Sequence, residues 1–175
     1  IEAALYASNF PCNYYKKDKF AFLRLNLEFD VSKFFSSIDK KIKRSKTKIY
    51  SYDHLFKYVD YSRKNAKIAG VEKQINFSRT EIEWLDIKFN KESVDRIVTR
   101  LPESKNTNLE KIYNEFFYQS EYILKSKGSI ALISRIPNVV KKHAIKHNFT
   151  VAKEKSVWSG SEELTLLLLK NVKNL

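Results

Sequence analysis

Residues 129–170 read SIALIS, RIPNVVKKHAIKHN, FTVAKEKSVW, SGS and EELTLLLLK in succession. The apolar run Ser129–Ser134 predicts a central strand, and Asn138–Asn148 predicts a short helix. The β-type runs Phe149–Trp158 and Glu163–Lys170 are separated by Ser159-Gly160-Ser161, which is a turn sequence. The sequence therefore predicts a strand, a helix and a C-terminal antiparallel hairpin.

Upstream of residue 129, short β-type runs alternate with amphipathic helical stretches. The predicted strands are Lys48–Asp53, Gln74–Arg79 and Val94–Thr99, and the predicted helices are Ile1–Ala7, residues 31–43, about Leu55 to Ala69, and one that begins near Thr107. Phe20–Leu27 alternates in polarity and predicts a short strand or an extended arm. This alternation is typical of an α/β fold with a mostly parallel sheet flanked by helices.

The helix that begins near Thr107 has marked ends. Thr107 and Glu110 form a capping-box pattern. Lys125 and Lys127 suit a helix C-terminus, and Gly128 predicts the end of the helix.

The helix predicted over residues 31–43 carries both an apolar and a basic signal. Asp30 predicts its N-cap. Its apolar residues share one face, and they are Val31, Phe34, Phe35, Ile38 and Ile42. Beyond that face the chain is basic, with Lys40, Lys41, Lys43, Arg44, Lys46 and Lys48. This basic run predicts contact with an RNA backbone, and the alternative is an ordinary solvated helix end.

The whole chain is basic as well, with 33 Lys and Arg against 20 Asp and Glu and a net charge of +13. A positive net charge of this size favours the binding of polyanions, with nucleic acid as the first candidate. The alternative is that the source organism has a generally basic proteome. No apolar run approaches the ~20 residues that would cross a bilayer. Cys12 is the single cysteine, which excludes an internal disulfide and fits a cytoplasmic location.

Three further absences restrict the possible sites. With three glycines in the sequence, a Gly-rich phosphate loop is excluded within this stretch. His143 and His147 are four residues apart, but no third ligand accompanies them, so no metal site is expected. Met is absent and the chain opens at Ile1. We therefore expect residues 1–175 to be one domain, a fragment that lacks upstream sequence.

Several segments resemble class I S-adenosylmethionine-dependent methyltransferases, above all the THUMP-associated RNA guanine-N2 methyltransferases of archaea and bacteria. They are IEAALYA from Ile1, FAFLRLNLEFD from Phe20, IYSYDHLFKYVDYSRKNAKIAGV from Ile49, VDRIVTRLP from Val94 and EYILKSKGSIALIS from Glu121. The run Asn65–Val71 is the most specific part. The resemblance implies a Rossmann-like sheet ending in an antiparallel hairpin, with the family's Gly-rich cofactor turn and THUMP domain upstream of Ile1.

The ends of the predicted strands carry the candidate cofactor residues, because ligands of such sheets bind beyond the carboxyl ends of the strands. By resemblance, Asp53 accepts hydrogen bonds from the ribose hydroxyls of S-adenosylmethionine; the alternative is that Asp53 caps the next helix. Glu81 matches an acidic residue that contacts the adenine amino group, or is a solvated side chain. Thr80 and Thr99 are the remaining cofactor candidates.

The segment Arg100-Leu101-Pro102-Glu103 occupies the position of the family's catalytic motif, and it departs from that motif. The family has Asn or Asp, then Pro-Pro, then an aromatic residue that stacks on the target base. Arg100 offers donors and no acceptor, and Glu103 offers no ring. The resemblance thus implies tRNA guanine-N2 methylation. The departure leaves open a catalytically degenerate relative that binds RNA or a partner.

Overall fold

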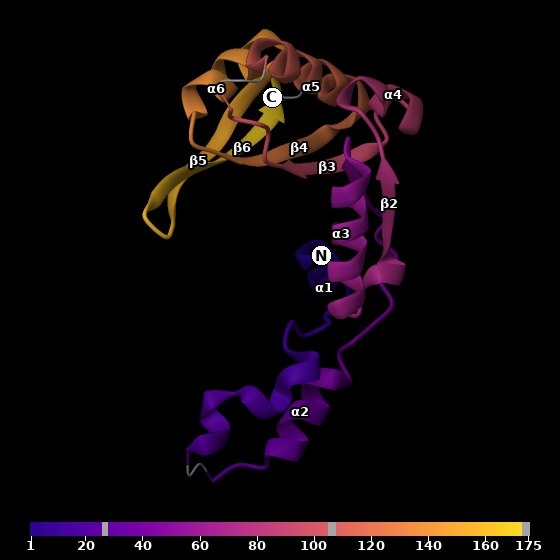
Figure 1. Cartoon of the computed structure of the whole chain (residues 1–175), viewed down its shortest axis with the longest axis vertical. Helices are drawn as coiled ribbons and strands as arrows, with labels where there is room; N and C mark the ends of the chain where they lie inside the picture. The colour runs from indigo at the N-terminus through magenta and orange to yellow at the C-terminus, as the bar shows by residue number, and fades with distance from the viewer. Residues whose placement is uncertain (26–27, 105–107, 173–175) are drawn as a thin grey trace. The chain divides into compact units, whose positions relative to one another are not determined.

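The computed structural model describes residues 1–25, 28–104 and 108–172, and the chain divides into two compact units, Ile1–Thr80 and Glu81–Leu175 (Figure 1). Each unit has its own sheet and its own hydrophobic core. Both contain helices and strands, so the α/β class is confirmed.

The first unit contains a two-stranded parallel sheet, β1 (Ile49–Asp53) and β2 (Ile75–Arg79), joined by α3 (Phe56–Ile68). It also contains α1 (Glu2–Ser8), α2 (Val31–Asp39) and the 3-10 helices Tyr14–Lys19, Ala21–Arg24 and Glu72–Gln74. The strands pair in register, so that Asp53 lies beside Arg79. The small core consists of Ala4, Ala66, Val71 and Ile75.

The second unit is built on a four-stranded sheet in the order β3-β4-β6-β5. Its elements are a 3-10 helix Ile82–Trp84, α4 (Leu85–Lys88), β3 (Val94–Thr99), α5 (Leu109–Ile123), β4 (Leu124–Ser134), α6 (Pro137–Lys146), β5 (Phe149–Ser159) and β6 (Glu162–Asn171). β3 and β4 run parallel, whereas β6 pairs antiparallel with both β4 and β5. The predicted C-terminal hairpin is therefore confirmed.

The core of the second unit lies between this sheet and α5 and α6, which lie together over one face of it in Figure 1. Phe117 and Tyr113 of α5 are fully buried, and Ile130 of β4 and Leu167 of β6 are buried with them. Leu101, the second residue after the end of β3, also belongs to this core. The loop after β3 is thus anchored to the core at its second residue.

The predicted end of α5 was wrong. The helix stops at Ile123, and Lys125, Lys127 and Gly128 lie in β4. The ladder between β3 and β4 shifts register between Val94 and Arg96, where β4 contains extra residues. A Cβ at Gly128 would lie 2.8 Å from the carbonyl oxygen of Lys125. Gly128 therefore serves this irregular strand, not a helix end.

Two other predicted elements differ. A 3-10 helix covers Ala21–Arg24, where a strand or extended arm was expected within Phe20–Leu27; residues 26 and 27 lie outside the described residues. Thr107 also lies outside them, and the N-cap of α5 is Asn108, whose Oδ1 accepts the N–H of Lys111 at 3.1 Å. Asp30 caps α2 as predicted, since its Oδ1 accepts the N–H of Lys33 at 2.9 Å.

No helix in the described parts of the chain combines the length and the apolar character that crossing a membrane requires.

Candidate cofactor site and substrate loop

Asp53 lies at the carboxyl end of β1, in the first unit. Its Oδ1 accepts the N–H of Leu55 at 2.8 Å, and its carbonyl oxygen accepts the N–H of Thr80 at 3.0 Å. The structure thus brings together Asp53 and Thr80, two of the predicted cofactor residues, at the end of the parallel pair. The ends of such strands are where ligands bind in open α/β sheets.

The carboxylate of Asp53 is about one-third exposed, at 37%. Its hydrogen bond to Leu55 is local and leaves the N-cap of α3 without a side-chain cap. The predicted alternative, that Asp53 caps the next helix, is therefore wrong: Oδ1 makes a turn contact before α3, whose N-cap is Leu55. No hydrogen bond from the described residues engages Oδ2, and a carboxylate has acceptor sites on both oxygens. Asp53 can therefore accept hydrogen bonds from a diol while keeping its local contact.

Glu81 opens the second unit, directly before the 3-10 helix Ile82–Trp84, where its carbonyl oxygen accepts the N–H of Trp84 at 3.2 Å. Its side chain does not cap that helix. Thr99 ends β3 and is paired with Leu132 of β4. Thr99 therefore lies with residues 100–103 at the carboxyl ends of two parallel strands of the second unit.

The segment Arg100–Glu103 is fixed at three points. Leu101 is buried in the core, and the Tyr113 hydroxyl donates to the carbonyl oxygen of Pro102 at 3.2 Å. Oε1 of Glu103 accepts the backbone N–H of Arg135 at 2.8 Å. Because Arg135 follows the end of β4, Glu103 joins the loops after the two neighbouring strands. No pattern in the sequence predicts this hydrogen bond between Glu103 and Arg135, because it depends on the pairing of β3 with β4.

Arg100 is paired within the same segment. Its guanidinium donates to Oε2 of Glu103 at 3.2 Å, and the Glu103 side chain is 11% exposed. Burial raises the pKa of Glu103, but hydrogen bonds from Arg135, Ser134 and Arg100, with the charge of Arg100, together hold this pKa below its usual value. Glu103 is therefore ionised at neutral pH, and its charge offsets that of Arg100.

The predicted RNA-binding residues lie between α2 and β1. α2 ends at Asp39, so most of the run from Lys40 to Lys48 is an irregular segment and not a helix end. Two hydrogen bonds to the end of α1 hold it: the Lys43 N–H donates to Ser8, and the Asn9 amide donates to the Lys41 carbonyl. All six basic side chains are exposed, and no carboxylate of the described residues forms an ion pair with them.

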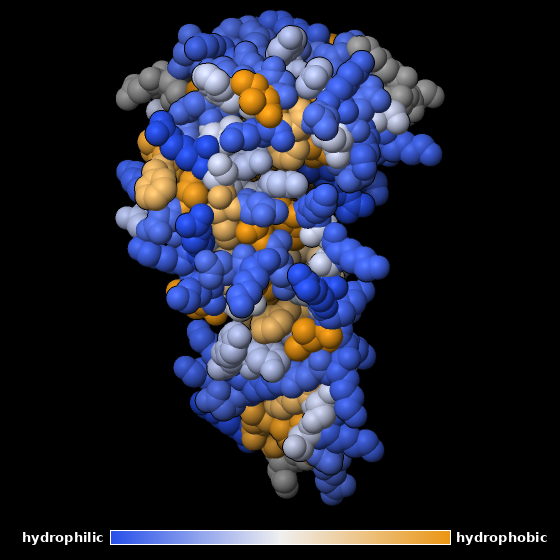
Figure 2. Space-filling model, turned by 90° about the vertical axis from the view of Figure 1, so that its right-hand side faces the viewer, coloured by the Kyte–Doolittle hydropathy of each residue, from blue (hydrophilic) through white to orange (hydrophobic). Residues whose placement is uncertain are grey.

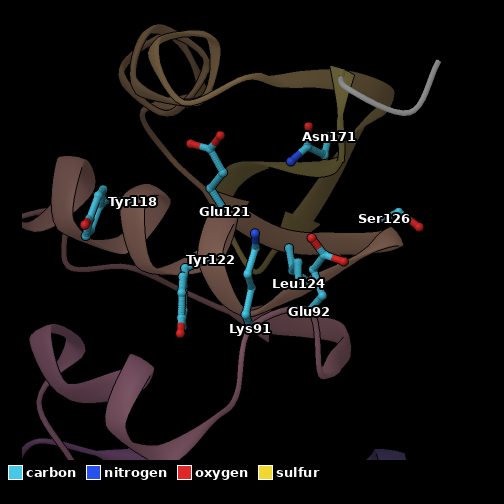
Figure 3. Close-up of a pocket in the computed structure, with 8 residues that line it drawn as sticks. All are labelled: Lys91, Glu92, Tyr118, Glu121, Tyr122, Leu124, Ser126 and Asn171. Carbon is cyan, nitrogen blue, oxygen red and sulfur yellow. The ribbon is translucent and has the colours of Figure 1, made fainter.

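A hollow of about 500 Å³, which the sequence did not predict, lies in the second unit, and Figure 3 shows the residues that line it. Its lining includes Lys91 and Glu92 before β3, Tyr118 and Tyr122 of α5, and Asn171 at the end of β6. Lys91 and Glu92 precede β3, whereas Arg100–Glu103 follows it, so the hollow and the Arg100–Glu103 segment lie at opposite ends of this strand. Open α/β sheets bind their ligands beyond the carboxyl ends of the strands. The hollow lies at the amino end of β3, so it is not the candidate site.

His143 is a core histidine. Its side chain is 1% exposed, with Nδ1 2.9 Å from Oδ1 of Asn114 and Nε2 3.2 Å from Oε2 of Glu110. Burial lowers the pKa of His143, although Glu110 raises it in part. The parts of the chain that the structure describes contain no cluster of three His, Cys, Asp or Glu residues suited to a metal ion.

Comparison with known proteins identifies the family. Residues 1–164 match the model of the RMKL-like methyltransferase domain. The chain is 28% identical over 166 residues to a tRNA (guanine(6)-N2)-methyltransferase of Methanocaldococcus jannaschii, covering 91% of this chain and 42% of that protein. This chain therefore spans less than half the length of that relative.

Two solved structures show the fold. SMU.472, a putative methyltransferase complexed with SAH, aligns with a TM-score of 0.79 over 97% of this chain and 44% of its own, at 16% identity. TrmN from Thermus thermophilus aligns with a TM-score of 0.63 over 71% of this chain and 36% of its own, at 23% identity. With the predicted Rossmann-like order of elements confirmed and the family model matched over residues 1–164, the chain belongs to the RMKL-like methyltransferase domain family.

Proposed function

We propose that this chain is the methyltransferase part of an S-adenosylmethionine-dependent RNA methyltransferase that acts on the N2 amino group of guanine in tRNA. The observation that carries the proposal is the position of Asp53 at the carboxyl end of β1, where its backbone carbonyl oxygen accepts the N–H of Thr80. The name of the archaeal relative supplies the substrate. When bound, the cofactor supplies a methyl group carried on a sulfonium.

Asp53 fits the cofactor by the chemistry of its oxygens. Ribose hydroxyls are donors, and Asp53 retains acceptor capacity beyond its bond to Leu55. In this proposal Thr80 accompanies Asp53 in the first unit, and Glu81 and Thr99 are the cofactor candidates of the second unit. A cytoplasmic location, an upstream THUMP domain and an upstream Gly-rich cofactor turn belong to the same proposal. The resemblance of residues 1–7 to the helix that follows this turn in the family supports the turn.

The segment Arg100–Glu103 is proposed to face the target base, which must leave any stacked helix to be reached. An unpaired arginine here would repel a sulfonium, but Arg100 is bonded to the ionised Glu103. The pair therefore removes most of the electrostatic conflict. It does not replace the acceptor and the aromatic ring of the family motif.

That departure favours a second candidate, a degenerate relative that binds RNA without methylating it. In such a relative, the ion pair between Arg100 and Glu103 would stabilise the conformation of the loop after β3 and have no catalytic role. The exposed basic run Lys40–Lys48 would contact phosphates in both candidates, because six unpaired cations form a favourable track for a polyanion. Transfer of a labelled methyl group to tRNA by the full-length protein separates the two. Activity supports the enzyme, whereas inactivity that Arg100→Asn reverses supports the degenerate relative.

Cofactor binding is tested by calorimetric titration of the full-length protein with S-adenosylmethionine. Asp53→Asn retains an oxygen for the Leu55 N–H but removes the charge. We expect about 10- to 100-fold weaker binding, since hydrogen bonds to charged groups contribute ~1.5–3 kcal/mol. The matched control is Asp60→Asn, because Asp60 is equally exposed and is paired with Lys64 in α3. Equal affinities of the two variants, or no binding by folded wild type, would refute the cofactor site.

A further inference from the structure

Phenylalanine side chains of α2 and of the segment before it surround a hollow of about 130 Å³. The lining includes Phe20, Phe22, Phe34, Phe35, Ile38 and Lys17. The rings contact one another and leave the hollow open: Phe34 lies edge-on to Phe22, with centroids 5.9 Å apart. The volume equals about four water molecules at ~30 Å³ each, which is room for a small planar group.

This aromatic pocket is not part of a buried core. No described residue from Asn9 to Tyr58 is buried, although α2 presents a continuous apolar face. Phe34 keeps 42% of its surface exposed and Phe29 keeps 40%. In Figure 2 an orange area bordered by blue lies low in the molecule, at the height at which Figure 1 shows α2. Contiguous exposed apolar surface rimmed by polar residues marks an interaction site.

The surroundings of the aromatic pocket are strongly basic. Residues 9–48 contain eleven Lys and Arg against four Asp and Glu, so they carry more than half of the net charge of the chain. Lys17 lines the pocket, with its Nζ 5.5 Å from the centroid of Phe35 and 4.4 Å from that of Tyr14, and it is ion-paired with Asp39 of α2. The excess of positive charge therefore comes from the other Lys and Arg of residues 9–48, above all Lys40–Lys48, whose exposed side chains have no ion-pair partner among the described residues. An occupant that joins an apolar planar group to a negatively charged chain fits this surface.

We propose that the aromatic pocket binds one unpaired nucleobase of an RNA strand whose phosphates contact the basic run Lys40–Lys48. The proposal rests on RNA being the substrate class, and it adds a second contact to the one proposed for the Arg100–Glu103 segment. Proteins that bind single strands combine aromatic faces for the bases with a basic track for the backbone. The face of a second protein would fill the hollow but would gain nothing from the excess of cations around it.

The test uses the full-length protein and a fluorescently labelled single-stranded RNA octamer, with the same octamer in duplex form as the comparison. Phe34→Ala removes an exposed ring from a helix in which alanine is favourable. We expect its single-strand affinity to fall about 5- to 100-fold, with little change for the duplex and an unchanged salt slope. Phe34→Trp retains a ring and should restore binding. Tyr6→Ala, which removes an 88% exposed ring in α1, is the matched control.

The inference is overturned if Phe34→Ala binds the single strand as tightly as wild type and Tyr6→Ala do. It is also overturned if single strand and duplex weaken equally, because the pocket would then only shape the basic run. Dimerisation that Phe34→Ala abolishes, with RNA binding intact, would assign the surface to a second copy instead. Titration with S-adenosylmethionine is independent of all these arms, so loss of the cofactor site and loss of the base pocket are distinguishable.

Discussion

Glu103 should stabilise the second unit more than its surface neighbours do, because it joins the loops that follow β3 and β4. Glu103→Gln retains the shape of the side chain but removes its negative charge. In the wild type, Oε1 of this carboxylate accepts the Arg135 N–H at 2.8 Å, and Oε2 accepts the Arg100 guanidinium at 3.2 Å. Hydrogen bonds to charged groups contribute ~1.5–3 kcal/mol against ~0.5–1.5 kcal/mol for neutral ones. We therefore expect a loss of about 1–2 kcal/mol in unfolding free energy at pH 7, measured with urea.

The same substitution should change the pH dependence of stability. The pKa of Glu103 is lowered in the folded protein, so the unfolded chain takes up the proton first as the pH falls. The stabilisation is complete above the unfolded pKa of about 4.3 and is lost as the pH falls through the folded value. The difference between wild type and Glu103→Gln should therefore be constant from pH 7 to about pH 5.5 and shrink below about pH 4.

Glu162→Gln provides the control. Glu162 is also bonded to Arg135, at 2.7 Å, but both side chains are about half exposed. Exposed ion pairs contribute ~0–1 kcal/mol, so this variant should lose much less stability. The reasoning about burial is refuted if the two variants are equally stable, or if the loss in Glu103→Gln does not diminish in acid.

Three other predictions concern the hydrophobic core, the buried His143 and the basic run Lys40–Lys48. Phe117→Ala should cost about 3–5 kcal/mol in urea unfolding, because Phe117 is fully buried, whereas Tyr118→Ala at a 61% exposed neighbour should change little; equal losses would contradict the packing. The pKa of His143 is lowered by burial, so wild type should lose stability as the pH falls below about 6.5, and His143→Gln should lose less over that range; parallel profiles would be the contrary result. Lys43→Gln with Arg44→Gln should reduce the slope of log affinity against log salt for tRNA by about 0.7–0.9 per contact, and an unchanged slope would exclude them as phosphate contacts.

The alternation of strands and helices could be predicted because each element carries its own periodicity. The C-terminal hairpin is the clearest case, since Gly160 adopts a positive φ of 62° in the turn between two β-type runs. The error at Gly128 has the same kind of cause. A glycine that ends a helix and one that serves an irregular strand look alike in sequence, and pairing with β3 distinguishes them.

The candidate site was predictable only as far as strand ends reveal it. Asp53 and the Arg100–Glu103 segment follow β-type runs, so their positions could be inferred. The bond between Glu103 and Arg135 could not, because it joins residues 32 positions apart through the pairing of β3 with β4. The aromatic pocket was likewise missed: the sequence predicted that the apolar residues of α2 share one face, but not that the structure would leave none of them fully buried.

The two edges of the four-stranded sheet differ in how they resist unwanted association. β5 has a register shift between Val151 and Lys153 and a run of exposed charged side chains, both of which discourage a further strand from pairing. β3 has no ladder partner on its outer side among the described residues, and Val98 at that edge is 79% exposed. Because an unpaired edge with an exposed apolar side chain is a template for pairing with another chain, we expect unwanted association through β3 more than through β5, and Val98→Lys should reduce it.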